Sequence, residues 1–414
     1  MRKRSAARGR LAAAALLAAG VLLLTACGGG GGGQAGGAGG GSETGGGGDV
    51  IKIGADFNLT GSVSSLDVPA FRGAQLAAEE VNAKGGVLGK KIQLISYDGK
   101  SDPATVANIT TQMIENDKVV AITGFTDTDS ALAAGPIAQA AGIPFLTTGA
   151  TSPKLPDQVG DFMFLVPFGD NVQAAAMAEF AYKELHAKTA YLLLNNGYEY
   201  THLLAQYFKD RFTQLAGPNS ILLEDTYEAS DTDYSAQIAK FKALPQKPDF
   251  LFISAYPDEV GSVVKQFREA GVTLPILGGD GYDTPLLTQV AGEKADEVYF
   301  STHSYMDPQN GTPAIKAFME AYKKKYGDYP ENAFAAMGYD SVNLLVDAIQ
   351  RANSTDPKAI RDALAQTKGF QAISGEITYP EGKRVPQKAV TIIHVVKGKL
   401  TLAKQWVPEV VPAP

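Results

Sequence analysis

Short apolar runs alternate with amphipathic segments from about residue 50 to residue 407. Runs of three to six apolar residues rich in β-branched side chains, such as 119–122 and 143–146, predict buried strands. Segments with apolar residues three and four positions apart, such as 131–141, predict helices packed on a sheet. We expect residues 56–68 to form a long polar loop and the first helix to span 71–83. The repeated strand–helix units predict an α/β fold with parallel sheets and right-handed crossovers, followed by a strand-rich end.

Polar residues follow two neighbouring strands, at 126–130 and at 147–151. Two consecutive strand-to-helix turns lie at the carboxyl edge of a parallel sheet, where ligands bind. Thr128 in the first turn and Thr151 in the second would place hydroxyls beside free helix amides, which suits a small anionic group. Ordinary helix capping explains a single threonine equally well. The functional interpretation therefore depends on both turns together.

Three further polar side chains follow predicted strands in the second half of the chain, namely Tyr200, Tyr256 and Asp280. If the first-half hydroxyls hold a carboxylate, Asp280 could hold an ammonium group, assisted by the tyrosine faces. Together these groups predict a cleft for a zwitterion. Taken singly, each tyrosine could be a core or surface residue, and Asp280 could belong to a plain Gly-Asp-Gly turn.

The first residues predict export. Five basic residues precede a 14-residue apolar segment, and no acidic residue lies among them. This pattern is typical of a secretory signal, which we place at residues 1–26. The following Leu24-Thr25-Ala26-Cys27 resembles the lipobox of bacterial lipoproteins, which implies a lipid on Cys27 and a membrane anchor. A chance cysteine is the alternative. Residues 27–48 are glycine-rich and predict a disordered tether.

Composition and missing motifs narrow the function. Removing residues 1–26 leaves 32 of the 37 basic residues against 44 acidic ones, a net charge of −12, which argues against a nucleic acid partner. The sequence has no G-x-S-x-G or H-E-x-x-H motif, its four histidines are scattered, and Cys27 is its one cysteine. We therefore expect no metal ion, no cofactor and no enzymatic activity. The run from Gly85 to Lys91 is one residue short of a phosphate-binding loop and reads as a turn.

Several short motifs are spread over residues 50 to about 400. They are Leu59-Thr60-Gly61, Asn82-Ala83-Lys84-Gly85-Gly86-Val87-Leu88-Gly89, Tyr97-Asp98, Gly142-Ile143-Pro144, Gln266-Phe267-Arg268-Glu269-Ala270-Gly271 and Gly338-Tyr339-Asp340. In these motifs the chain resembles the periplasmic leucine/isoleucine/valine-binding proteins of ABC transporters. The resemblance implies the type I periplasmic binding protein fold, which has two doubly wound parallel-sheet lobes joined by three crossovers, near Phe168, His303 and Gly382.

On this basis we expect lobe 1 to comprise residues 49–168 and 303–382, lobe 2 to comprise 169–302 and 383–407, and 408–414 to form a tail. The resemblance implies that ligand contacts fall on Thr128, Gly149, Thr151, Tyr200, Tyr256 and Asp280. Two departures from the family bear on specificity. Leu66 stands where relatives often have an aromatic residue, and Asp127 and Asp129 bracket the proposed carboxylate site, which is unfavourable unless both point away.

The resulting prediction is a monomeric, lipid-anchored extracytoplasmic receptor that binds a branched-chain or other apolar amino acid and presents it to an ABC permease. Related proteins bind amides, urea or aromatic acids, and these remain alternative ligands. A ligand sensor on the same fold and a secreted enzyme are alternative functions. The lipobox argues against a cytoplasmic sensor, and the missing nucleophile–base pair argues against an enzyme.

Overall fold

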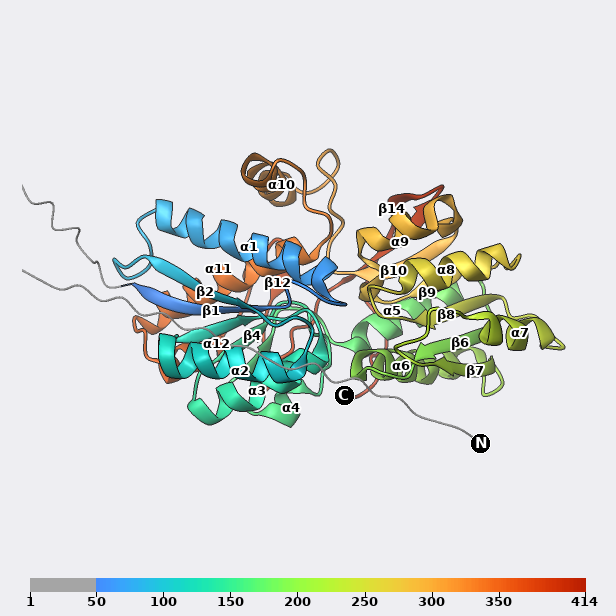
Figure 1. Ribbon diagram of the computed structural model, residues 1–414, viewed down its shortest axis with the longest axis horizontal. Helices are drawn as coiled ribbons and strands as arrows, with labels where there is room; N and C mark the ends of the chain where they lie inside the picture. The colour runs from blue at the N-terminus through green and yellow to red at the C-terminus, as the bar shows by residue number, and fades with distance from the viewer. Residues whose placement is uncertain (1–49) are drawn as a thin grey trace, which may run out of the picture. The chain divides into compact units, whose positions relative to one another are not determined.

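The computed structural model describes residues 50–414, and the predictions for the signal, Cys27 and the glycine-rich tether lie outside them. Within the described residues the strands form two large sheets (Figure 1). The first sheet has the order β2-β1-β3-β4-β5, and all its pairs are parallel. Its strands are β1 (Ile51–Phe57), β2 (Ile92–Asp98), β3 (Ala121–Gly124), β4 (Phe145–Thr147) and β5 (Met163–Leu165).

The second sheet has the order β14-β13-β10-β9-β8-β6-β7. Five of its strands are parallel, as the strand–helix alternation predicts, whereas β13 and β14 add an antiparallel edge. The strands are β6 (Ala190–Asn195), β7 (Ile221–Tyr227), β8 (Phe250–Ser254), β9 (Ile276–Gly278), β10 (Val298–Thr302), β13 (Val390–Val396) and β14 (Lys399–Trp406). A short hairpin, β11 (Phe370–Ala372) with β12 (Gly375–Ile377), stands apart from both sheets.

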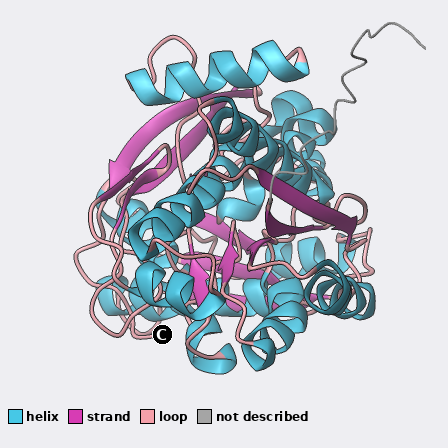
Figure 2. Ribbon diagram, turned by 90° about the vertical axis from the view of Figure 1, so that its left-hand side faces the viewer, coloured by secondary structure: helices cyan, strands magenta, loops and turns pink. Residues whose placement is uncertain are grey.

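Helices cover both faces of each sheet (Figure 2). Ile53 and Phe57 of β1 pack into one core with α1, α11 and α12, whereas Ile122 of β3 packs into another with α2, α3 and α4. In the second sheet, Leu192 packs with α5 and α6, and Leu193 packs with α7, α8 and α9. The helices of the first sheet are α1 (Ser64–Ala83), α2 (Pro103–Gln112), α3 (Thr128–Ala141), α4 (Leu155–Val159), α11 (Phe334–Ala352) and α12 (Pro357–Ala365). Those of the second are α5 (Asp170–Lys183), α6 (Glu199–Ala216), α7 (Ser235–Ala243), α8 (Val260–Glu269) and α9 (Pro285–Ala291).

We call the first sheet with its helices lobe 1 and the second sheet with its helices lobe 2. The chain passes between the two sheets after β5, after β10 and again before β13. Helix α10 (Pro313–Tyr326) packs against α1 in lobe 1. A short π-helix lies at Met113–Asp117, and short 3-10 helices lie at Asp280–Tyr282 and Gly292–Ala295. Beyond β14 the tail reaches α5, where Asn171 Nδ2 donates to Pro412 O at 2.8 Å.

The predicted loop at 56–68 is wrong at both ends, because β1 continues to Phe57 and α1 begins at Ser64 and not at residue 71. Pro69 lies inside this helix, and it lacks the N–H that would bond to the carbonyl of Ser65 four residues earlier. Asn332 Nδ2 supplies the missing donor, at 3.0 Å from Ser65 O. The early turn is therefore stabilised by a residue distant in sequence, and it brings Leu66 to the edge of lobe 1.

Candidate functional site

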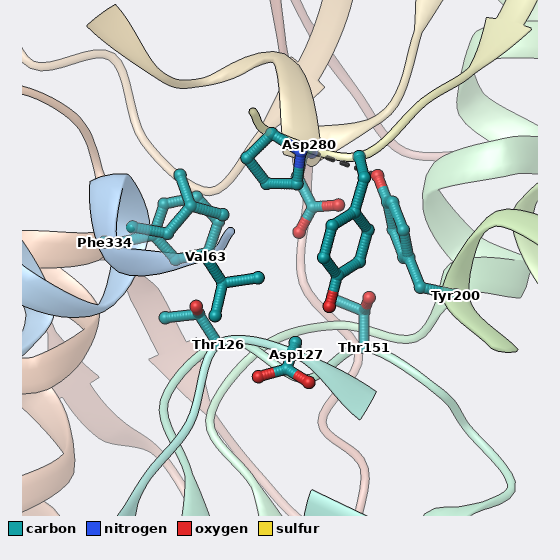
Figure 3. Close-up of a pocket in the computed structure, with 11 residues that line it drawn as sticks. Val63, Thr126, Asp127, Thr151, Tyr200, Asp280 and Phe334 are labelled. Carbon is teal, nitrogen blue, oxygen red and sulfur yellow. Dashed lines mark hydrogen bonds between the residues drawn. The ribbon is translucent and has the colours of Figure 1, made fainter. Parts of the chain in front are cut away.

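A cavity lies between the two lobes (Figure 3). Its space is at most about 270 Å³, including the part that is open to solvent. Lobe 1 contributes residues from the α1 turn, the two strand-to-helix turns and the start of α11, and lobe 2 contributes the turns after β6, β8 and β9. The lining residues are Val63, Leu66, Thr126, Asp127, Thr151, Tyr200, Tyr256, Pro257, Asp280, Gly281 and Phe334.

Five of the residues singled out in the sequence line this cavity, namely Leu66, Thr151, Tyr200, Tyr256 and Asp280. Thr128 and Gly149 do not. Thr128 is the first residue of α3, and its buried hydroxyl has no hydrogen-bond partner. Gly149 lies behind the wall, where an added Cβ would come within 2.7 Å of the Phe334 ring. Thr126 and Asp127 line the cavity where Thr128 was expected.

The turn before α3 is occupied by carboxylates of the protein itself. Asp127 is the N-cap of α3 and accepts from Ser130 N at 2.8 Å and from Asn58 Nδ2 at 3.1 Å. Asp67, on α1, accepts from Thr126 N at 2.8 Å and from Asn58 N at 2.6 Å. Burial, and then the charge of Asp127, raises the pKa of Asp67 well above its usual value. Burial also raises the pKa of Asp127, although hydrogen bonds from Ser130 and Tyr256 oppose the shift.

The second turn uses its amides to join the two turns together. Gly149 N donates to Phe125 O at 3.1 Å, and Thr148 N donates to Gly124 O at 3.0 Å. Thr151 O accepts from Asp170 N at 2.7 Å, at the first crossover between the lobes. The Thr148 and Gly149 amides are therefore bonded within the protein. The Thr151 side chain is left to face a ligand.

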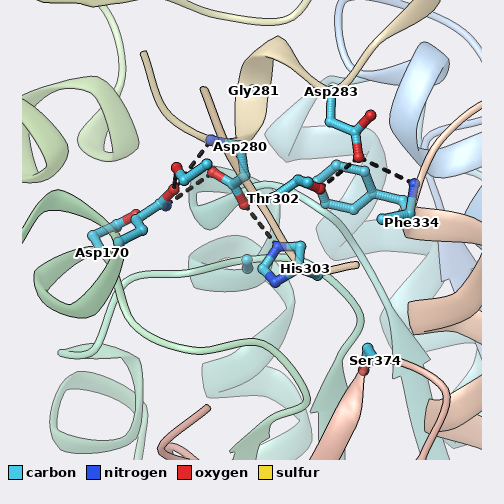
Figure 4. A network of polar contacts seen from close by, with 12 residues as sticks. Asp170, Asp280, Gly281, Asp283, Thr302, His303, Phe334 and Ser374 are labelled. Carbon is cyan, nitrogen blue, oxygen red and sulfur yellow. Dashed lines mark hydrogen bonds and ion pairs between the residues drawn. The ribbon is translucent and has the colours of Figure 1, made fainter. Parts of the chain in front are cut away.

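On the lobe 2 side, a polar network holds Asp280 in place (Figure 4). Asp280 Oδ1 accepts from Gln173 Nε2 and Oδ2 pairs with His303 Nε2, each at 2.9 Å. Burial lowers the pKa of His303, more than Asp280 raises it, so a neutral ring donates from Nε2 to Asp280 Oδ2. Gln173 Nε2 also donates to Asp170, and burial followed by the Asp280 charge raises the pKa of Asp170 to about 8.

Two aromatic side chains form the rest of the lobe 2 wall. Tyr200 Oη accepts from Gly281 N at 3.0 Å, so the ring is fixed against the turn that carries Asp280. The Tyr256 ring stacks on Tyr198 with centroids 3.6 Å apart and planes 6° apart. Tyr256 N donates to Glu259 Oε1 at 2.6 Å. Tyr200 is therefore held beside Asp280, whereas Tyr256 lies near Asp127, and the faces of such rings can attract a cationic group.

Comparison with known proteins agrees with this architecture. The periplasmic binding protein family matches residues 50–399. The chain belongs to this family. It is 27% identical, over 80% of its length and 86% of the relative's, to a leucine-, isoleucine-, valine-, threonine- and alanine-binding protein of Pseudomonas aeruginosa. The predicted resemblance is thus confirmed.

Solved structures of two family members share the fold. One is the branched-chain amino acid transporter substrate-binding protein LivJ of Streptococcus pneumoniae in complex with isoleucine, at 31% identity and a TM-score of 0.80, covering 87% of this chain and all of that one. The other is the leucine-binding protein LivK of Thermotoga maritima, at 33% identity and the same TM-score, covering 87% and 99%. The predicted fold class of two doubly wound lobes is therefore confirmed.

The lobes of this binding protein touch each other beside the cavity. Thr284 Oγ1, at the start of α9, donates to Ser65 Oγ of α1 at 3.0 Å. Asp283 Oδ2 accepts from Thr302 Oγ1 at 2.6 Å and from Ala333 N, just before α11, at 3.1 Å. The contacts bring the two walls together in a closed arrangement.

Sequence reasoning missed Thr126, Asp127, Val63, Pro257, Gly281 and Phe334 as lining residues. Asp127 had a signal, since it lies in the turn identified from the sequence, but the neighbouring threonine was preferred. Phe334 had none, because its place depends on α11 packing against α1 in lobe 1. Within residues 50–414 there is no cluster of three or more side chains suited to a metal ion. No helix in that range is long and apolar enough to span a membrane.

Proposed function

We propose that this protein is the extracytoplasmic solute-binding component of an ABC importer, which holds a small apolar, amine-bearing solute between its two lobes. The observation that carries the proposal is the cavity itself, which is lined from both lobes and bordered by the Asp280 carboxyl. The names of the relatives support transport of amino acids in particular.

A branched-chain or other apolar amino acid is the ligand that the relatives favour. In this assignment Asp280 and the faces of Tyr200 and Tyr256 hold the ammonium group. Val63, Leu66 and Phe334 provide the apolar surface for the side chain. An amide or urea is the second candidate, and Asp127 favours it, because this acid lines the place where a ligand carboxylate was expected. An aromatic acid has no such observation in its favour.

Binding would act by shifting the balance between open and closed lobes. Ligand contacts on both walls add to the Ser65–Thr284 and Asp283–Ala333 contacts that already join the lobes. A permease that recognises the closed form would then receive only loaded receptor. No bond is made or broken in this cycle. A ligand sensor would use the same closure with a different partner.

Export and anchoring are inferred from the first residues of the chain. Removal of residues 1–26 and lipidation of Cys27 would attach the protein to the outer surface of the cell membrane. Residues 27–48 would act as a tether, with a reach of roughly 25 Å for a glycine-rich coil. We propose that the anchored receptor is a monomer, with no nucleic acid partner.

Thermal unfolding of the whole chain, purified in detergent, tests the binding function. The panel contains apolar amino acids, their amides, urea and aromatic acids. A ligand present at a hundred times its dissociation constant adds about 2.7 kcal/mol to the free energy of unfolding, which corresponds to a rise of a few degrees in Tm. We expect such a rise with at least one member of the panel. Unchanged Tm with every member would contradict the proposed function.

A further inference from the structure

On the lobe 1 wall of the cavity, an acidic side chain of the protein already occupies the start of α3, where a ligand anion could otherwise bind. Ser130 N, one of the free amides at the start of α3, donates to Asp127 Oδ1 at 2.8 Å. Thr126 N donates to Asp67 Oδ1 at 2.8 Å, and Asn58 donates to both acids. A ligand carboxylate at this turn would therefore meet the acceptor oxygens of two acids and find these donors taken.

No cation on the cavity wall offsets these acids. None of the eleven lining residues is Lys, Arg or His. His303 lies behind Asp280 and is bonded to it. Lys388 is buried and donates to Val166 O and to Ser374 Oγ, away from the wall. A ligand carboxylate would thus enter a cavity whose lining includes two acids, Asp127 and Asp280, and no basic side chain.

An unpaired hydroxyl beside Asp127 faces the same space. Thr126 lines the cavity and is only 7% exposed, yet its Oγ1 has no hydrogen-bond partner. In Figure 3 its side chain lies beside Asp127, across the cavity from Asp280. A buried hydroxyl without a partner is costly, so this atom is suited to a polar ligand group. Asp127 and Thr126 together present acceptors at one end of the cavity, and Asp280 presents an acceptor at the other.

We infer that the ligand is a small apolar solute with nitrogen donors at both ends and no free carboxylate, such as an amino-acid amide, with its second nitrogen directed at Asp127. The inference rests on the proposed function and narrows its ligand class. Asp280 receives the amino group, and Asp127 with Thr126 receives the carboxamide. In this role Asp127 determines specificity, because a ligand carboxylate in place of the carboxamide would be repelled.

L-leucine and L-leucinamide form a matched pair for the test, since they differ in the carboxylate alone. Calorimetric titration of the whole chain in detergent, after dialysis, should give a dissociation constant for leucinamide at least about tenfold lower than that for leucine. Asp127→Ser removes the charge and keeps a good helix N-cap. In this variant the preference should shift toward leucine by about tenfold or more. Asp129→Asn removes an acid two residues away that does not line the cavity, and it should leave the preference unchanged.

The outcomes separate this inference from the proposed function. Equal or tighter binding of leucine by the unaltered protein would overturn the inference and leave the receptor role intact. A preference for leucinamide that persists in Asp127→Ser would overturn the role of Asp127. If neither compound binds, the other ligands of the panel test the inference. Binding confined to carboxylate-free members such as urea supports the inference, and binding of benzoate alone overturns it. Absence of binding by every compound would contradict the proposed function itself.

Discussion

The two walls of the cavity differ in how their charges arise. On lobe 2, Asp280 projects from a short turn after β9 and is held by two side chains, Gln173 and His303. On lobe 1, Asp127 caps its own helix, and Asp67 bonds to the amide of the preceding turn. The first arrangement displays a carboxyl group to a ligand, whereas the second also engages the Thr126 and Ser130 amides, which a ligand anion could otherwise use. A strand-to-helix turn can therefore appear suited to anion binding and yet be filled by its own capping residue.

The largest effect is expected for the apolar part of the lobe 1 wall. Phe334 is 1% exposed, and its ring contacts the His303 ring at a centroid distance of 5.4 Å. Phe334→Ala should lower the free energy of unfolding by about 3–5 kcal/mol, because it removes buried contacts and leaves a void. Denaturant unfolding measures this loss, and Phe334→Leu should lose much less. Equal stability of the Ala variant and the unaltered protein would show that this wall is not a packed structure.

The next effect concerns the charge on the lobe 2 wall. Asp280→Asn keeps the volume of the side chain and removes its charge, so affinity for an amine-bearing ligand should fall about a hundredfold, or about 2.7 kcal/mol. Titration of the best ligand from the panel measures the change. Asp258→Asn is the control, because it removes an exposed acid next to Pro257. A loss of less than threefold in Asp280→Asn would remove Asp280 as the partner of the amino group.

A smaller effect is the pH dependence of stability that arises from Asp170, the acid behind Asp280. Burial and the Asp280 charge raise the pKa of Asp170 to about 8, so folded protein retains a proton that unfolded protein has lost. The free energy of unfolding should therefore decrease as pH rises from about 4 to about 8, by up to about 1.4 kcal/mol per pH unit from this group. Glu259 and Asp56, with pKa values raised to about 7 by burial, act in the same direction.

Asp170→Asn isolates the contribution of this one group. Unfolding by denaturant at a series of pH values should give a shallower decline for the variant than for the unaltered protein. The difference between the two slopes should be largest between the ordinary pKa of an aspartate and about 8. Parallel slopes would mean that Asp170 is ionised in the folded protein and that the lobe 2 wall carries two charges.

Much of the fold follows from periodicity, because strand and helix repeats depend on local burial. The helix predicted at 131–141 lies within α3 and ends at the same residue, Ala141. The start of α1 could not be predicted in this way, because Pro69 suggests a helix break. The side chain that donates to the unpaired Ser65 carbonyl, Asn332, lies far along the chain. In the site, the run 126–130 contains two acids and three hydroxyls, all of them possible caps, and the pattern does not say which one faces the cavity. Phe334 and Gly281 arrive there only through tertiary packing.

A crystal structure of the protein with the tightest ligand of the panel would reveal which ligand atoms meet each wall of the cavity. We expect one ligand nitrogen within hydrogen-bond distance of Asp280 and another within hydrogen-bond distance of Asp127 or Thr126, with the apolar part against Leu66 and Phe334. A ligand carboxylate beside Asp127, or a ligand bound outside the cavity between the lobes, would contradict this expectation.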